Sequence, residues 1–121
     1  MNQRLTRAEE EIMHLFWELG PSLVSALIDA MPEPKPPHSS VSSVVRILEK
    51  KGFLDHKTYG KTYEYYPLIS KEEYSRFSLR RLVSQYFEGS ANELVSFLVK
   101  ENELTLSELE KIKISFLSPE K

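Results

Sequence analysis

The residues best suited to chemistry lie in a short polar stretch in the middle of the chain. Within about two helical turns the sequence places Ser39, Ser40, Ser42, Ser43 and Arg46. Hydroxyl and guanidinium groups near the start of a helix can hydrogen-bond to base edges in the DNA major groove or to phosphate oxygens. A plainer interpretation is that the serines cap and solvate a surface helix, which is their more common use.

A second polar group follows in an expected β-hairpin. Two runs rich in aromatic and β-branched residues, 53–58 and 62–66, flank a three-residue connection that contains glycine, a pattern typical of a hairpin. Lys57, Tyr59 and Lys61 bring two cations and an aromatic ring to this hairpin, which suits phosphate contacts, although a solvated turn would carry the same residues. In the second run, aromatic residues stand at both odd and even positions and would point to both faces of the strand. Either face of the hairpin could therefore be the buried one.

The helices that surround these residues are marked by a repeated capping pattern. A Ser or Thr is followed three residues later by Glu at Thr6/Glu9, Ser70/Glu73, Ser90/Glu93 and Thr105/Glu108. The hydroxyl can accept a bond from the Glu amide while the carboxylate accepts one from the Ser or Thr amide. Apolar residues at helical spacing follow each pattern, so we expect helices over 6–19, 71–87, 91–101 and 106–117.

Two more helices are expected before the hairpin. Apolar spacing predicts a helix over 22–31, and the four prolines of residues 32–37 predict a stiff turn. Ser39 or Ser40 is then expected to cap a third helix, which Gly52 ends. Three helices and a hairpin predict a winged helix-turn-helix, whose third helix enters the DNA major groove.

The expected fold class is therefore mainly α (α+β), with a winged-helix DNA-binding domain over 1–70. Residues 71–121 are expected to form a helical dimerisation region, because amphipathic helices without a sheet to cover need a second copy to bury their apolar faces. The expected dimer contacts are Tyr74, Phe77, Leu82, Val83, Tyr86, Phe87, Leu94, Phe97 and Leu98.

Composition narrows the class of protein. A chain of 121 residues has no room for two enzymatic domains, and the absence of cysteine excludes disulfides and thiolate metal sites. The net charge is −2, yet residues 35–67 hold six Lys or Arg against three Asp or Glu, which makes the middle of the chain locally basic. With no apolar leader and no long apolar run, we expect a cytoplasmic protein.

No catalytic or metal-binding motif stands out. The histidines, His14, His38 and His56, are far apart in sequence without ligand spacing or a carboxylate cluster, so we expect no metal site and no cofactor. The four glycines lie at turns and helix ends rather than in a phosphate-binding loop, and no nucleophile motif is present, so we do not expect an enzyme.

Three segments resemble the BlaI/MecI/CopY family of penicillinase repressors: residues 5–17, 41–54 and 59–67. The similarity extends over about residues 5–100 and is best in the first 75. It implies a homodimer that binds palindromic operator DNA upstream of β-lactamase or related resistance genes. It also implies recognition-helix contacts at Ser39, Ser40, Ser42, Ser43 and Arg46, and wing contacts at Lys57, Tyr59 and Lys61.

The missing cysteines exclude the copper-sensing branch of that family, which leaves the β-lactam branch. In that branch the resemblance implies relief of repression by cleavage in the dimerisation helices, triggered by a membrane sensor protease, near Ser96, Phe97 and Leu98. Two alternatives remain open from the residues alone. One is a winged-helix adaptor that docks on a protein, and the other is a small-molecule-responsive regulator.

Overall fold

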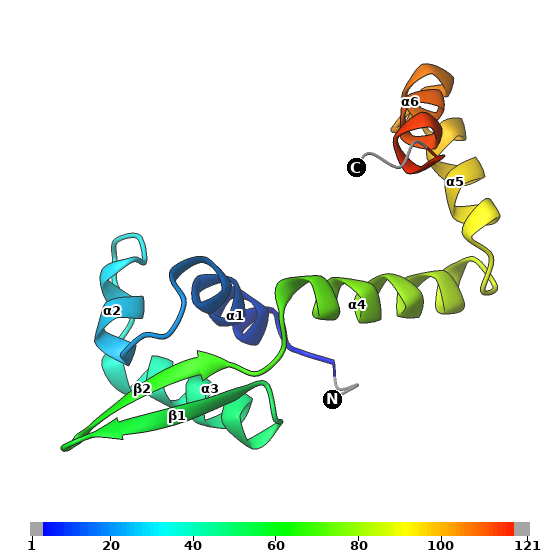
Figure 1. Cartoon of the computed structure of the whole chain (residues 1–121). Coiled ribbons are helices and arrows are strands. Elements are labelled where there is room, and N and C mark those ends of the chain that lie inside the picture. The colour runs from blue at the N-terminus through cyan, green and yellow to red at the C-terminus, as the bar shows by residue number, and fades with distance from the viewer. Residues whose placement is uncertain (1–3, 118–121) are drawn as a thin grey trace. The chain divides into compact units, whose positions relative to one another are not determined.

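The computed structural model describes the backbone of residues 4–117 and the side chains of residues 4–112. Helices and one two-stranded antiparallel sheet follow one another along these residues (Figure 1). In chain order the elements are α1 (Arg7–Leu19), α2 (Val24–Asp29), α3 (His38–Lys50), β1 (Leu54–Tyr59), β2 (Thr62–Pro67), α4 (Lys71–Tyr86), α5 (Ala91–Lys100) and α6 (Leu106–Leu117). This order confirms the predicted mainly α fold of the winged-helix type. Within the described residues, every helix is too short or too polar to cross a membrane.

Helix α1 begins where its capping pattern predicts. The Thr6 hydroxyl accepts a bond from the Glu9 amide at 3.2 Å, and the Glu9 carboxylate accepts one from the Thr6 amide at 2.9 Å. Gly20 ends the helix with φ of +81°, a left-handed conformation that favours glycine. The reciprocal bonds also form at Ser70/Glu73 and Thr105/Glu108, and Ser90 accepts from the Glu93 amide.

Helix α2 is shorter than the predicted range of 22–31. Ser22 and Tyr65 exchange two backbone hydrogen bonds of 2.9 Å, which hold residue 22 in extended backbone against β2 and delay the helix. At the other end, the Lys35 ammonium donates to the carbonyls of Ile28 and Met31 at 3.1 and 2.6 Å. A cation at the carbonyl end of a helix satisfies otherwise unpaired groups, so the proline-rich turn also caps α2.

The predicted serine cap of α3 is wrong. Pro37 occupies the N-cap position without a side-chain cap, and its carbonyl accepts bonds from the amides of Ser40 and Val41 at 3.1 and 3.3 Å. Proline needs no amide partner here, so α3 can begin directly after it, at His38. Ser39 and Ser40 consequently lie inside the first turn, and both are exposed.

The hairpin has a shorter connection than predicted. Tyr59 pairs with Thr62 in the ladder, so Gly60 and Lys61 alone form the turn, and Gly60 takes φ of +61°. A positive φ at the first residue of a two-residue turn suits the right-handed twist of the strands. The question of the buried face is answered by Tyr65, which is buried, whereas Tyr63 on the same face is about half exposed.

The core of the first unit lies between the three helices and the hairpin. Its fully buried side chains are Met13, Phe16, Leu27, Val45, Leu48, Phe53 and Leu54. The chain divides into two compact units, residues 1–75 and 76–121, whereas the predicted boundary follows residue 70. The first turn of α4 thus belongs with the winged helix.

Tyr74 explains the position of this division, because its side chain is used within the first unit, which leaves little of it for the predicted dimer contact. Its side chain is 8% exposed and packs against the rings of Trp17 and Phe53, with centroid distances of 5.8 and 5.9 Å. Its hydroxyl donates to the Glu10 carboxylate at 2.7 Å. Trp17 is half-buried beside it, and the Trp17 indole donates to the Ile69 carbonyl at 2.9 Å.

A part-buried ion pair joins the start of α1 to the end of α3. The Lys51 ammonium lies 2.7 Å from the Glu9 carboxylate, whose side chain is 7% exposed. Burial raises the pKa of the Glu9 carboxyl, but the bonds and charge from Lys51, together with the bonds from Thr6, outweigh burial and hold this pKa below its usual 4.5. The carboxylate that caps α1 therefore also ties two helices of the core together.

We expect Glu9→Gln to lower the free energy of unfolding by about 1–3 kcal/mol at neutral pH, because Lys51 loses its charged partner. The pKa of Glu9 is lower in the folded than in the unfolded chain. Its stabilisation is therefore present above pH 4.5 and is lost as the pH falls through the folded-state value. Urea unfolding of wild type and variant at neutral and at acid pH measures both effects.

The matched control is Glu11→Gln, because Glu11 forms an exposed pair with Arg7 at 3.7 Å on the same helix. This change should cost less than about 0.5 kcal/mol. If the free energies of unfolding of wild type and Glu9→Gln differed by the same amount at neutral and at acid pH, the ion pair between Glu9 and Lys51 would not be the source of the difference.

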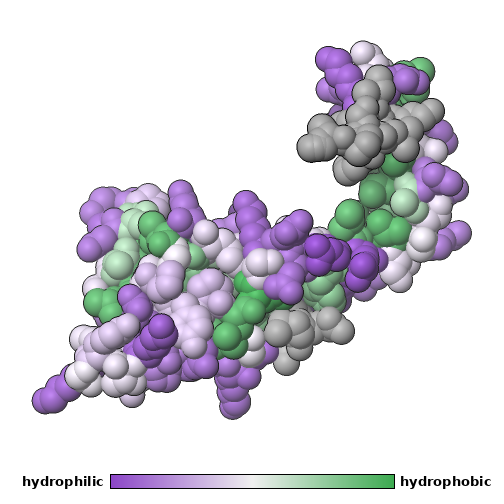
Figure 2. Space-filling model, viewed as in Figure 1, coloured by the Kyte–Doolittle hydropathy of each residue, from purple (hydrophilic) through white to green (hydrophobic). Residues whose placement is uncertain are grey.

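The second unit holds the end of α4 together with α5 and α6. None of its described side chains, from Arg76 to Ile112, is buried. Phe87 and Phe97 contact each other with ring centroids 5.6 Å apart, yet Phe97 is still 49% exposed. Figure 2 shows hydrophobic surface gathered over α5. The described apolar side chains of this unit are exposed or only half-buried in the single chain.

Candidate nucleic-acid interface

The outer face of α3 carries the predicted recognition residues. Val41, Val45 and Leu48 are buried on the inner face. Helical periodicity then turns the opposite side outward, where Ser39, Ser40, Ser43 and Arg46 are exposed. Ser42 is half-buried, and its hydroxyl lies 3.3 Å from Nδ1 of His38 in a hydrogen bond. The face offers small hydroxyl groups beside one guanidinium, as DNA base edges and phosphates require.

An open hollow lies between this face and the hairpin. It is lined by Leu23, Val24, Ser25, His38, Ser42, Arg46, Lys61, Thr62, Tyr63 and Tyr65. Three of the predicted DNA contacts, Ser42, Arg46 and Lys61, are therefore brought together from α3 and the turn of the hairpin. Two cations beside hydroxyl groups give this hollow the chemistry of a phosphate site.

The other two wing residues lie differently. Lys57 pairs across the ladder with Glu64, and its ammonium is 5.9 Å from the centre of the Tyr66 ring. Because side chains alternate along a strand, Lys57 and Tyr59 point to the face opposite His56, which contacts α3. Both are exposed, but neither is among the residues that line the hollow with Arg46.

Seven residues of the hollow were not predicted as DNA contacts from the sequence: Leu23, Val24, Ser25, His38, Thr62, Tyr63 and Tyr65. The helical spacing of His38, one turn before Ser42, does predict its place on the outer face, although not a contact role. Ser25 and Tyr63 carried no such signal, because their approach to α3 depends on how α2 and the hairpin pack.

The electrostatics of the hollow involve Tyr65. Burial raises the pKa of the Tyr65 hydroxyl, the Glu49 carboxylate and Tyr63 act in the same direction, and Arg46 opposes them. Tyr65 therefore stays a neutral phenol near neutral pH, and the charge of this region is left to Arg46, Lys61 and the acids around them.

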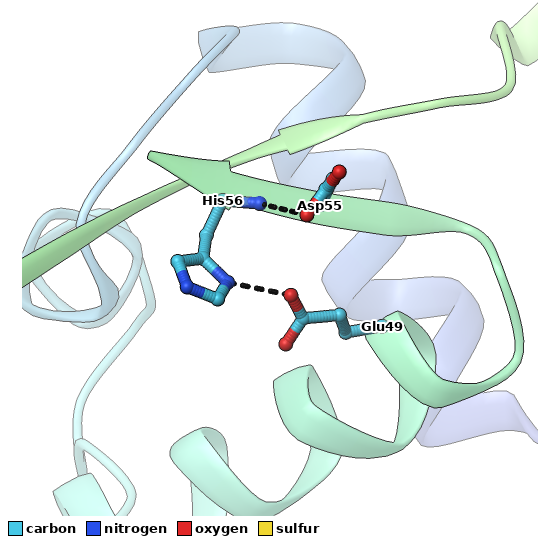
Figure 3. Close-up of side chains that lie close together, drawn as sticks. All are labelled: Glu49, Asp55 and His56. Atoms are coloured by element: carbon cyan, nitrogen blue, oxygen red, sulfur yellow. Dashed lines mark hydrogen bonds and ion pairs between the residues drawn. The ribbon is translucent and has the colours of Figure 1, made fainter. Parts of the chain in front are cut away.

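One expectation about the histidines is wrong, because carboxylates do gather beside His56. Nδ1 of His56 lies 2.5 Å from a carboxylate oxygen of Glu49, and the Asp55 carboxylate accepts a bond from the His56 amide at 2.8 Å (Figure 3). The His56 ring stacks on Tyr63 at 4.2 Å. Glu49 lies in the last turn of α3 and His56 belongs to β1, so this cluster joins α3 to the hairpin.

The expected dimer and cleavage residues belong to the second unit, Tyr74 excepted, and all of these but Phe87, which follows the end of α4, lie in helices. Leu82, Tyr86 and Phe97 are exposed, and the remaining members of the set are half-buried: Phe77, Val83, Phe87, Leu94 and Leu98. Leu79, which was not among the predicted contacts, is 53% exposed. Ser96, Phe97 and Leu98 lie within α5 rather than in a loop.

Comparison with known proteins agrees with this architecture. The sequence model of the penicillinase repressor family matches residues 5–116. The methicillin resistance regulatory protein MecI of Staphylococcus aureus (strain N315) and that of Staphylococcus epidermidis are each 24% identical over 110 residues, covering 90% of this chain and 89% of theirs. The protein of the same name from Mammaliicoccus sciuri is 24% identical over 114 residues with the same coverage.

Family membership bears on three predictions. Members of this family are transcriptional regulators, which confirms the prediction of a regulator rather than an enzyme. The resemblance drawn from residues 5–17, 41–54 and 59–67, and the choice of the β-lactam branch, are confirmed as well. With its winged-helix fold and a match over nearly its whole length, the chain belongs to the penicillinase repressor family.

Proposed function

We propose that this chain represses transcription by binding palindromic operator DNA as a homodimer. The observation that carries the proposal is the hollow in which Ser42 and Arg46 of α3 meet Lys61 of the hairpin turn. In a winged helix this arrangement lets α3 enter the major groove while the turn contacts the phosphate backbone. The regulated genes are those of β-lactamase or related resistance, in keeping with the name of the methicillin resistance regulatory relatives.

The second unit supplies the dimer contact. Apolar side chains that remain uncovered in one chain cost free energy in water, and a second copy of the same helices can cover them. The contact residues are Phe77, Leu82, Val83, Tyr86, Phe87, Leu94, Phe97 and Leu98. Such a dimer would present its two α3 helices to successive major grooves about 34 Å apart.

Repression is relieved by disrupting these helices. A cut near Ser96, Phe97 or Leu98 would divide α5, and the halves of the dimer would then bind DNA separately and weakly. A membrane sensor protease, or a protease that it activates, is the partner that would make the cut. Support for this step comes from the uncovered apolar side chains of α5.

The proposal is tested by titrating operator DNA from the chain's own promoter at several salt concentrations. We expect steep salt dependence, because each phosphate contact releases bound counterions. Arg46→Ala should lower the preference for operator over unrelated DNA by about tenfold or more. Lys61→Ala should weaken binding to all sequences alike and reduce the salt slope by about one.

Arg7→Ala is the matched control, because it removes an exposed cation on α1 outside the proposed interface. It should leave both preference and slope unchanged. Absence of DNA binding at every salt concentration would instead favour a winged helix that docks on another protein.

A further inference from the structure

Three side chains of types that commonly bind metal ions converge where α3 meets the hairpin. Glu49, Asp55 and His56 each offer one ligand atom, and these atoms lie within 4.8 Å of one another. Glu49 and His56 are half-buried and Asp55 is exposed. Metal–ligand bonds of about 2.0–2.2 Å place two ligands of one ion about 3–4 Å apart. The atoms would thus need to shift by only about 1 Å to enclose an ion.

The fold holds two of the three groups in position. The His56 ring is stacked on Tyr63 at 4.2 Å and also contacts Tyr65 at 5.4 Å, which restricts its rotation. Glu49 is carried by the last turn of α3, and Gly52 with φ of +90° turns the chain back so that β1 passes beside it. A ligand set whose side chains are already ordered loses less entropy when it binds an ion.

The charges at this junction also favour a cation. Glu49 and Asp55 are two of the three acidic residues in the basic middle of the chain, 35–67, and their charge would repel DNA phosphate. Among the residues that the structure describes, His56 is the one basic side chain that forms an ion pair with Glu49, and no lysine or arginine pairs with Asp55. A bound divalent cation would neutralise both carboxylates.

We propose that Glu49, Asp55 and His56 bind a divalent transition-metal ion of the Zn²⁺ class. An imidazole nitrogen with two carboxylate oxygens is a borderline donor set that suits Zn²⁺ better than Mg²⁺ or Ca²⁺, which prefer oxygen alone. Three protein ligands on a partly exposed site leave water to complete the coordination. The ion would take the place of the hydrogen bond between His56 and Glu49.

Such an ion would tie the end of the recognition helix to the first strand of the wing. Only this consequence, a fixed spacing between Arg46 and Lys61, rests on the proposed function. Metal binding itself is measured on the protein alone, so its outcome is independent of whether DNA binding is found.

The test uses the full chain, freed of metal by a chelator and titrated with Co²⁺, whose visible absorption reports ligation by protein groups, and with Zn²⁺ by calorimetry. Wild type should saturate at one ion per chain. His56→Asn should weaken binding by at least about tenfold, and Asp55→Asn, an exposed change that leaves the fold intact, should weaken it as well. His14→Asn and His38→Asn are the matched controls and should bind as wild type does.

Two outcomes would overturn the site. One is the absence of saturable Co²⁺ absorption in the wild-type protein. The other is an equal loss of metal affinity in His56→Asn and His38→Asn, which would mean that exposed histidines bind the ion without a defined coordination site. Circular dichroism of each variant shows whether it is folded. If His56→Asn does not fold, the metal affinity of Asp55→Asn decides between the two interpretations.

Discussion

Phe97→Asp is expected to convert the proposed homodimer to a monomer and to weaken operator binding by at least about 100-fold. Phe97 is 49% exposed in the single chain and is carried by a helix without a buried residue. A charge at this position would have to be buried without a partner in any dimer formed through α5. Loss of the dimer removes the gain that comes from linking two half-site contacts. Analytical ultracentrifugation and DNA titration measure the two effects.

Asn92→Asp is the matched control for this change, because it adds the same charge to α5 at an exposed polar position near the helix start. The control protein should remain a dimer with wild-type affinity. If Phe97→Asp also remained a dimer, the contact between subunits would have to lie outside α5.

Phe53→Ala is expected to lower the free energy of unfolding of the winged-helix unit by about 3–5 kcal/mol. Phe53 is fully buried between the end of α3 and β1, and its ring meets that of Tyr74 at 5.9 Å. Truncation would leave a cavity at the junction of α3, the hairpin and α4. Single domains are stable by only about 5–15 kcal/mol, so this loss is large. Urea unfolding followed by the fluorescence of Trp17, the one tryptophan, reports on this unit.

Tyr59→Ala provides the comparison, because Tyr59 is an aromatic residue of the same hairpin that is 57% exposed. Its truncation should change the free energy of unfolding by no more than about 0.5 kcal/mol. Similar losses for the two variants would mean that Phe53 is not part of the cooperative core.

Elements whose signals are local were predicted well. The capping bonds at Thr6/Glu9 act between residues three apart, and apolar spacing acts within one helix, so both can be interpreted without knowledge of the fold. The predicted range of α6 matches the structure, and α1, α4 and α5 differ from prediction by one residue. Local competition decided the start of α3, where Pro37 takes the cap in place of a serine.

Long-range packing decided what the local signals could not. Ser22 is held out of α2 by its bonds to Tyr65, and Tyr74 is buried against Trp17 rather than left to a partner. In both cases the competing interaction joins residues that are far apart in sequence. Periodicity cannot tell which apolar face covers a core in the same chain and which is left uncovered.

Residue types and spacing were enough to predict the order of elements, the polar face of α3 with its serines and Arg46, and the family to which the chain belongs. Three-dimensional packing was needed to bring Lys61 into a hollow with Arg46, to turn Lys57 to the opposite face, and to place Glu49 against His56. The physical reason is that local signals set conformation over a few residues. The direction in which β1 leaves the Gly52 turn, by contrast, is set by the burial of Phe53 and Tyr65 against distant helices.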